Sequence, residues 1–229
     1  MLLAGHACWA YIAGRLVASP LHTRPNMFLL LLLGMLPDFD LVLGIFGVQH
    51  RTLMHSVIFW SVLFAPFFAK YRLAALPYFV AVTQHILLGD LIVGRTPVLW
   101  PLEIKLGLGL SIISPVNLSM EAMGLALFGV LAFRENRLSL QNGGGIMTAA
   151  MAVLAIIALL GFALLASLGD YLLPIVLEES DARYLEKSLP TLLAGSGLQI
   201  AVVMHAMLAG MILILFVRAP RKHIEASRH

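Results

Sequence analysis

Long apolar runs recur along the whole 229-residue chain, and they constrain its fold more than any other feature. A run of about 20 apolar residues crosses a bilayer as a helix, because a helix satisfies its own backbone hydrogen bonds. Only 12% of the residues are charged and 60% are hydrophobic, whereas soluble domains carry about 25% charged residues. These values exclude a soluble globular protein and a disordered chain. Because the runs are continuous and not alternating, they predict an all-α, polytopic transmembrane helical bundle and disfavour a membrane β-barrel.

Seven apolar segments have the length and composition of membrane spans. They are about Leu2–Val17, Met27–Phe46, Leu53–Ala69, Leu73–Val93, Val116–Phe133, Ile146–Leu168 and Leu192–Val217. The apolar piece Leu106–Ile113 is too short to cross, so we predict an interfacial or re-entrant segment there. The single cysteine, Cys8, excludes an internal disulfide and a Cys-rich zinc site.

The basic residues predict how this bundle is oriented. The connections after the first, third and fifth spans and the C-terminal tail share ten of the fifteen Lys and Arg residues: Arg15, Arg24, Lys70, Arg72, Arg134, Arg137, Arg218, Arg221, Lys222 and Arg228. Cytoplasmic loops carry such an excess, so we expect the N-terminus outside and the C-terminus in the cytoplasm of a prokaryotic-type inner membrane. The connection Asp170–Pro190, with five acids and two bases, suits an external loop. In such a protein the net charge of +3 indicates basic loops, and no nucleic-acid partner is expected.

Histidines and acidic residues inside or beside the predicted spans gather in the first half of the chain, and the predicted topology places them all toward the outer leaflet. They are His6, Asp38, Asp40, His50, His55, His85, Asp90 and Glu121. Ionisable residues are costly in a membrane and usually functional. Imidazoles and carboxylates together suit Zn²⁺, with Mn²⁺ and Fe²⁺ as alternatives. The set therefore predicts a shared metal site. Helix capping is the structural alternative for Asp90 and Glu121, and hydrogen-bonded packing is the interpretation for the isolated His205.

Asp38 and Asp40 illustrate what such a site requires of the backbone. Two residues apart, they would point about 200° apart around a regular helix. Pro37 removes a backbone donor and favours a kink. A break at this proline would let both carboxylates turn toward one site.

Several motifs together resemble a known family over residues 1–125. They are His6, Gly34-x-x-Pro37-Asp38-x-Asp40, His50-Arg51-x-x-x-His55-Ser56, His85 followed by Asp90, and Thr96-Pro97-Val98-Leu99-Trp100-Pro101-Leu102. This pattern is similar to the YdjM-like membrane-bound metal-dependent hydrolases, a family distantly similar to the zinc-dependent phospholipase C and single-strand nuclease group. The resemblance implies metal-dependent phosphoester hydrolysis. The ligands that it implies are His6, Asp38, His50, His55, His85 and Asp90, with Asp40 as a ligand or a partner of one.

One spacing departs from the family pattern. The family places the late pair as His-x-x-x-Asp, whereas His85 and Asp90 are five residues apart. On a regular helix this changes their offset from about 40° to about 140°. A π-bulge would restore convergence; otherwise one of the two is not a ligand, and Gln84 is a substitute contact.

These observations predict a metal-dependent hydrolase that cleaves a phosphoester, lipid or lipid-linked, with a metal-activated water at the level of the outer leaflet. We predict a metal-bearing core over residues 1–125 and additional transmembrane helices over residues 126–229. Asp40, Arg51 and Glu121 are the predicted catalytic residues. Arg51 would hold a phosphate oxygen, and its structural alternative is an interfacial anchor. Two other functions stay open: a non-catalytic membrane protein with a structural metal site, and a metal or proton transporter.

Overall fold

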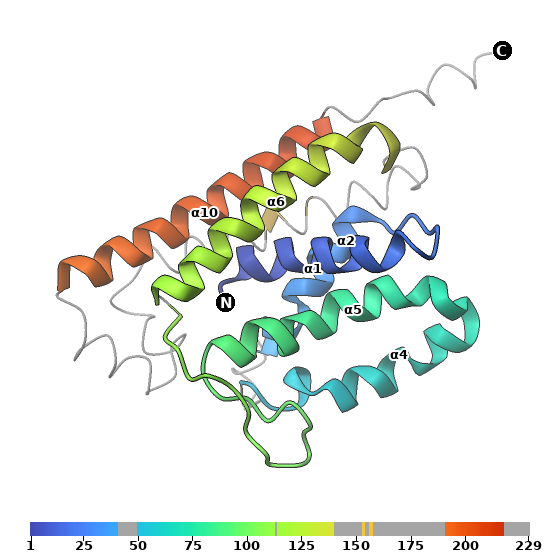
Figure 1. The fold of residues 1–229 in the computed structure, drawn as a ribbon, viewed down its shortest axis with the longest axis horizontal. Helices are drawn as coiled ribbons and strands as arrows, with labels where there is room; N and C mark the ends of the chain where they lie inside the picture. The colour runs from blue at the N-terminus through green and yellow to red at the C-terminus, as the bar shows by residue number, and fades with distance from the viewer. Residues whose placement is uncertain (41–49, 113, 140–152, 154–155, 158–190, 218–229) are drawn as a thin grey trace.

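A computed structural model gives the arrangement of the chain and describes residues 1–40, 50–112, 114–139, 153, 156–157 and 191–217 (Figure 1). Several predictions lie outside these residues: the end of the second span, most of the span Ile146–Leu168, the acidic connection Asp170–Pro190 and the basic tail after Val217.

Helices dominate the described residues, which confirms the predicted all-α class. In chain order they are α1 (Leu3–Ala18), α2 (Met27–Met35), the 3₁₀ turn η1 (Leu36–Phe39), the 3₁₀ turn η3 (Leu53–His55), α4 (Val57–Tyr71), the 3₁₀ turn η4 (Arg72–Ala75), α5 (Leu76–Gln84), the π-helical turn η5 (His85–Asp90), α6 (Pro115–Ser139) and α10 (Thr191–Val217). Among these residues the only β-type pairing is two isolated bridges, Val93 with Leu110 and Thr96 with Leu106.

Local sequence explains where several helices begin. The Asn26 side chain accepts a hydrogen bond from the Leu29 amide at the start of α2, and Ser56 caps α4 in the same way. Such side chains satisfy amide groups that have no partner within the helix. Pro77 and Pro115 lie in the first turn of α5 and α6, where a proline loses no helical hydrogen bond.

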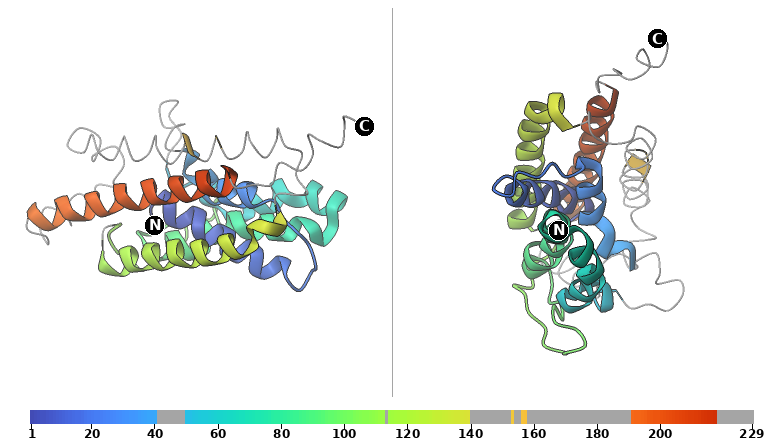
Figure 2. Two further views of the ribbon diagram at one scale, coloured as in Figure 1. Left: turned by 90° about the horizontal axis from the view of Figure 1, so that it is seen from above. Right: turned by 90° about the vertical axis from the view of Figure 1, so that its right-hand side faces the viewer.

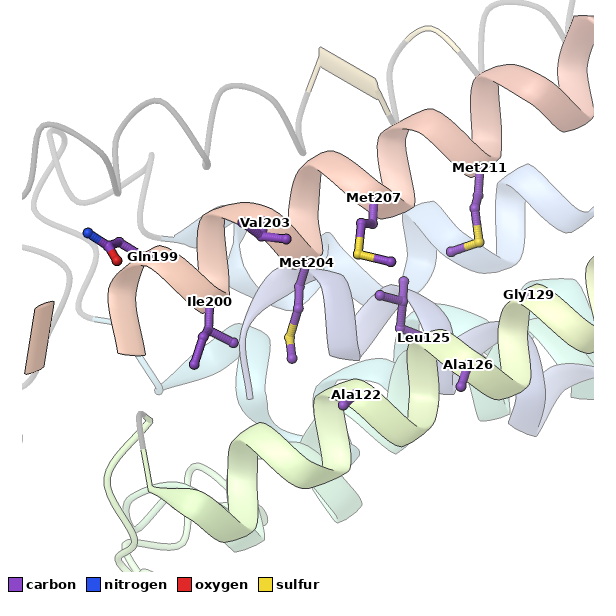
Figure 3. Close-up of a pocket in the computed structure, with 10 residues that line it drawn as sticks. All are labelled: Ala122, Leu125, Ala126, Gly129, Gln199, Ile200, Val203, Met204, Met207 and Met211. Carbon is purple, nitrogen blue, oxygen red and sulfur yellow. The ribbon is translucent and has the colours of Figure 1, made fainter. Parts of the chain in front are cut away.

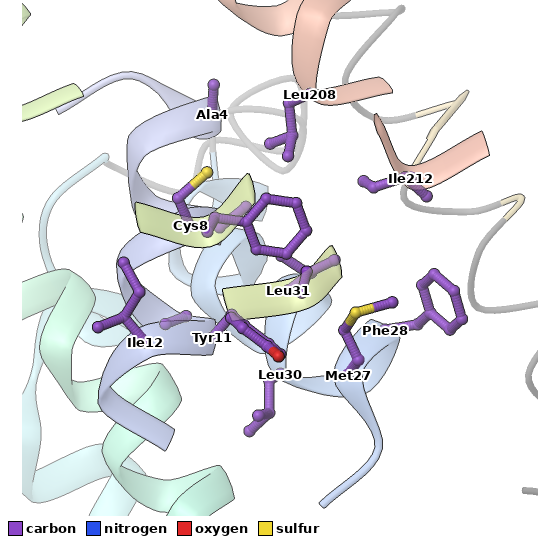
Figure 4. Close-up of a cluster of buried hydrophobic side chains, with 14 of the residues drawn as sticks. Ala4, Cys8, Tyr11, Ile12, Met27, Phe28, Leu30, Leu31, Leu208 and Ile212 are labelled. Atoms are coloured by element: carbon purple, nitrogen blue, oxygen red, sulfur yellow. The ribbon is translucent and has the colours of Figure 1, made fainter. Parts of the chain in front are cut away.

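Helix α1 is the centre of the bundle and packs against α2, α5, α6 and α10 (Figure 4). Cys8 and Tyr11 of α1 meet Leu31 of α2 and Leu208 of α10 in one buried cluster. The ring of Tyr11 also contacts Phe128 of α6 edge-on, with 5.1 Å between centroids. Because lipid competes for apolar surface, close van der Waals contact is what holds membrane helices together.

Among the residues that the structure describes, two segments are long and apolar enough to cross a membrane, Val57–Asp90 and Pro115–Arg134. Met27–Phe39 and Val202–Leu215 are shorter apolar helices. The first of the two long segments is divided at Arg72, whose φ of 51° ends α4. Figure 1 shows α4 and α5 as an antiparallel pair joined by this turn. These findings support a membrane protein.

The helices run between two ends of the bundle, and the chemistry differs between them (Figures 1 and 2). The beginnings of α1, α4 and α6 lie at one end, together with the end of α5. The connection from α1 to α2 and the turn from α4 to α5 lie at the other end, which carries basic residues of the larger predicted group: Arg15, Arg24, Lys70, Arg72 and Arg134. The candidate metal ligands lie at the first end.

Helices α6 and α10 run side by side and enclose an apolar groove (Figure 3). Small residues of α6, Ala122, Ala126 and Gly129, face the methionines of α10 across it. Small side chains let membrane helices approach closely.

Packing around α1 yields a stability prediction. Leu31→Ala removes a fully buried side chain and should lower the free energy of unfolding by about 2–5 kcal/mol, the usual cost of a leucine cavity. Leu127, on the surface of α6, is 40% exposed, so Leu127→Ala is the matched control and should change little. Thermal unfolding in detergent compares them; equal losses would contradict the packing described.

Candidate metal centre

Seven of the predicted site residues come together at one end of the bundle, from four separate parts of the chain. They form three overlapping groups, in each of which one ligand atom per residue lies within 4.8 Å of the others. The groups are Asp38, Asp40, His50 and His55; His6, Asp38 and His85; and His55, His85 and Asp90. Asp38 belongs to two groups and links them.

Asp38 and Asp40 reach one site because the α-helix ends before them. Helix α2 stops at Met35, and Pro37 lies in the 3₁₀ turn that follows. A 3₁₀ turn rotates by about 120° per residue, so residues two apart are separated by about 120°, whereas the rotation of about 200° on an α-helix separates them by about 160° the shorter way round. The break expected at Pro37 is therefore present, and it narrows the angle between the two carboxylates.

His85 and Asp90 converge through a π-helical turn, η5, which covers both of them. The i→i+5 hydrogen bond of such a turn brings residues five apart onto the same face. His85 Nε2 lies 4.0 Å from Asp90 Oδ2. The extra residue between them, relative to the family spacing, is thus accommodated by the backbone.

Two imidazoles are oriented by hydrogen bonds from their Nδ1 atoms. His55 Nδ1 donates to Asp90 Oδ2 at 2.6 Å, and His85 Nδ1 donates to the Gly34 carbonyl at 2.7 Å. Their Nε2 atoms lie 3.7 and 3.3 Å from Asp38 Oδ1. Both Nε2 atoms are buried and have no hydrogen-bond partner in the part of the chain that the structure describes. Metal-binding histidines commonly show this arrangement, with one nitrogen held by an oxygen and the other on the metal.

The distances between these atoms fit a divalent metal. Ligand atoms bound to Zn²⁺ at about 2.0–2.1 Å in tetrahedral geometry lie about 3.3 Å apart. Asp38 Oδ1 lies 3.3 Å from His85 Nε2, and Asp40 Oδ2 lies 3.3 Å from His55 Nε2. The orphaned nitrogens, the facing carboxylates and this spacing together fit a metal held by imidazole nitrogen and carboxylate oxygen.

Asp40 also organises the segment that carries His50 and Arg51. Its Oδ1 lies 2.7 Å from His50 Nδ1, and its Oδ2 accepts the Arg51 backbone amide at 3.1 Å. The His50 side chain is 27% exposed, more than the side chain of any other member of the three ligand groups that forms an ion pair. Arg51 Nε lies 4.0 Å from Asp90 Oδ1. The structure thus places Arg51 beside the carboxylates of Asp40 and Asp90.

His6 enters the centre from α1, and its place depends on Gly89, which the sequence did not reveal, and on Gln84, which was expected only as a substitute ligand. Its ring stacks on His85 with 3.5 Å between centroids and 13° between planes. Gly89, in the π-helical turn, leaves room for it, because a Cβ there would collide with the His6 ring. Gln84 donates to the His6 carbonyl at 2.9 Å. In the sequence, these contacts were indicated only by a glycine at position 89 and by the side-chain amide of Gln84 in an otherwise apolar helix.

Glu121 is not brought into the three groups. It accepts the backbone amide of Leu2 and packs against Gly5, at the beginning of α1. His205 of α10 is buried there as well, and its Nε2 accepts the Ala4 amide at 3.2 Å. The interpretation of His205 as a hydrogen-bonded packing residue is confirmed. Both side chains satisfy the free amide groups of α1, one turn from His6.

These features define a class: an all-helical membrane protein with a buried cluster of histidine and aspartate at one end of its helices. The chain belongs to the YdjM inner membrane protein family, whose family model matches residues 1–169. This confirms the resemblance seen in the sequence and the expected inner-membrane location. The family description names no reaction, so hydrolysis stays a prediction. No curated protein and no solved structure matched the chain.

The contact between Gly89 and His6 can be tested by adding a methyl group. Gly89→Ala should displace the His6 ring and weaken metal binding about 10- to 100-fold, as loss of a ligand's supporting contacts does. Gly210 is the control, because a Cβ there meets nothing within 4 Å. Bound metal, measured by elemental analysis after dialysis against a weak chelator, should fall for the first variant only.

The π-helical turn predicts that one of its residues can be deleted without loss of metal binding. Removing Leu87, which is 51% exposed, restores the family spacing of four residues, and a regular helix then keeps His85 and Asp90 on one face. Metal binding should survive. Deleting Val80 of α5 instead would rotate the site by about 100° and should abolish it. Loss of metal in both deletions would show that the turn has another role.

Proposed function

We propose that the protein is a membrane-embedded, metal-dependent hydrolase of phosphoesters. The observation that carries the proposal is the pair of oriented imidazoles, His55 and His85, whose buried Nε2 atoms face Asp38. Packing alone does not require that both rings be held by Nδ1 while both buried Nε2 atoms lie 3.3 Å from a carboxylate oxygen without a hydrogen bond. Asp38, His55 and His85 each belong to two of the three ligand groups, so these three residues would be the centre of any metal site there.

A divalent metal bound there would supply an activated water and neutralise charge on a phosphoryl group, as in other hydrolytic metal sites. The chain's own residues would do the rest. Asp90 holds the tautomer of His55, and Asp40 orients His50. Arg51, beside Asp90, would bind a phosphate oxygen with its guanidinium group. Glu121 would act indirectly, by anchoring the beginning of α1, which carries His6.

The proposed orientation places this site at the outer face of the membrane. It rests on seven spans and on the excess of basic residues at the opposite end of the bundle. The phosphoester groups of lipids lie at that level, so we infer a lipid or lipid-linked substrate. His50 and Asp38, with side chains 27% and 14% exposed, are the more accessible group members and would meet it first.

The decisive experiment measures metal and hydrolysis in the same preparations. Purified wild-type protein should contain zinc, manganese or iron and should release phosphate or headgroup from phosphatidic acid or phospholipid vesicles. Asp38→Ala and His55→Ala should each lose the metal and the activity, because each removes a member of a ligand group. His22→Ala, in the exposed connection at the other end, is the control and should keep both.

Three outcomes would contradict the hydrolase proposal. A wild-type protein without metal above trace would overturn it. Metal whose removal lowers thermal stability, without turnover of any of these substrates, would favour a structural metal site. Metal flux across proteoliposomes would favour a transporter.

A further inference from the structure

The loop of residues 93–112 connects the two segments that are long and apolar enough to cross a membrane, Val57–Asp90 and Pro115–Arg134. A connection between two spans emerges at the bilayer surface. This loop does so at the end of the bundle that holds the candidate metal centre, where Figure 1 shows it projecting beyond α4 and α5. Its position brings it near the bilayer surface, and its side chains decide whether it inserts.

The loop exposes apolar side chains that an aqueous connection would not carry. Leu102, Ile104, Leu106 and Leu108 recur at every second position, and they are 53, 57, 45 and 70% exposed. Leu99 is exposed as well, beside Trp100. Tryptophan and apolar residues of this kind favour the membrane interface.

The loop is also held firmly against the metal centre. Ser56, next to His55, donates its hydroxyl to the Trp100 carbonyl at 2.7 Å, and the Val57 amide donates to the Val98 carbonyl at 2.9 Å. The Leu108 amide donates to the Leu91 carbonyl at 2.7 Å, immediately after Asp90. Its base is thus built into the turns that carry His55 and Asp90.

The charges of the loop suit an anionic surface. Arg95 and Lys105 are exposed, against one exposed acid, Glu103. Basic groups next to a bilayer are attracted to anionic headgroups. We propose that this loop lies in the headgroup region of the protein's own membrane, with its leucines inserted and its two cations on anionic lipid. Its second role, delivery of a lipid substrate to the metal centre, rests on the proposed function.

An environment-sensitive fluorophore tests the insertion directly. Ile104→Cys is labelled with a nitrobenzoxadiazole dye in protein reconstituted into vesicles of phosphatidylethanolamine and phosphatidylglycerol; the native Cys8 is fully buried and does not compete. The dye should emit at shorter wavelength than in water and should be quenched by nitroxides carried near the lipid headgroup. His22→Cys, in the exposed connection at the other end, is the control and should report water.

The proposal is overturned if the dye at position 104 emits as it does at position 22 and lipid-borne nitroxides leave it unchanged. Because this measurement needs neither metal nor turnover, its result does not depend on the hydrolase proposal. If the loop inserts in a protein that holds no metal, the proposed membrane position of the loop stands and the hydrolase proposal fails.

A second variant tests the role of the cations. Arg95→Gln with Lys105→Gln should lower the hydrolysis of vesicle phospholipid several-fold, relative to the hydrolysis of a short water-soluble phosphoester. Screening by salt or vesicles of neutral lipid alone should remove the difference from wild type. An unchanged ratio in anionic vesicles, with metal content equal to wild type, would exclude a role of the loop in substrate delivery.

Discussion

The hydrogen bond between His55 and Asp90 is the interaction on which the rest of the site depends. It joins the turn before α4 to the end of the π-helical turn, and it directs the other nitrogen of His55 toward Asp38 and Asp40. Both side chains are buried. Removing one partner of a buried hydrogen bond costs about 1–3 kcal/mol, and more where a charged group is left without a partner, as Asp90 would be. The pair therefore constrains the fold and the ligand geometry together.

Regular helices would scatter these side chains, and apart from His6, which lies in the regular helix α1, the ligand-group residues lie outside regular α-helix or at its ends. Asp38 lies in a 3₁₀ turn after Pro37, His55 lies in a second 3₁₀ turn, and His85 and Asp90 lie in a π-helical turn. Such irregular turns are less favourable than an α-helix and recur at functional sites. Their concentration at the end of the bundle that holds the candidate metal ligands is what makes the cluster compact.

Much of this arrangement was predictable from the sequence. The all-α class follows from the length of the apolar runs, and the break at Pro37 follows from the chemistry of proline. The spacing of His85 and Asp90 on a shared face required a π-bulge, and one is present. Contacts between distant helices were not predictable, because no local pattern records them. Gly89 admits His6, the Gly34 carbonyl holds His85, and Glu121 contacts the beginning of α1 instead of joining the ligand groups.

The sequence by itself determined that this chain is a helical membrane protein and which polar side chains are too costly to be accidental in it. The length of its apolar runs and its charge count are local properties, and the bilayer acts on them directly. Only the tertiary structure decided how those side chains divide their roles. The division depends on which nitrogen of His55 and His85 meets an oxygen, and that is set by the approach of the π-helical turn η5 to α2 and to η3.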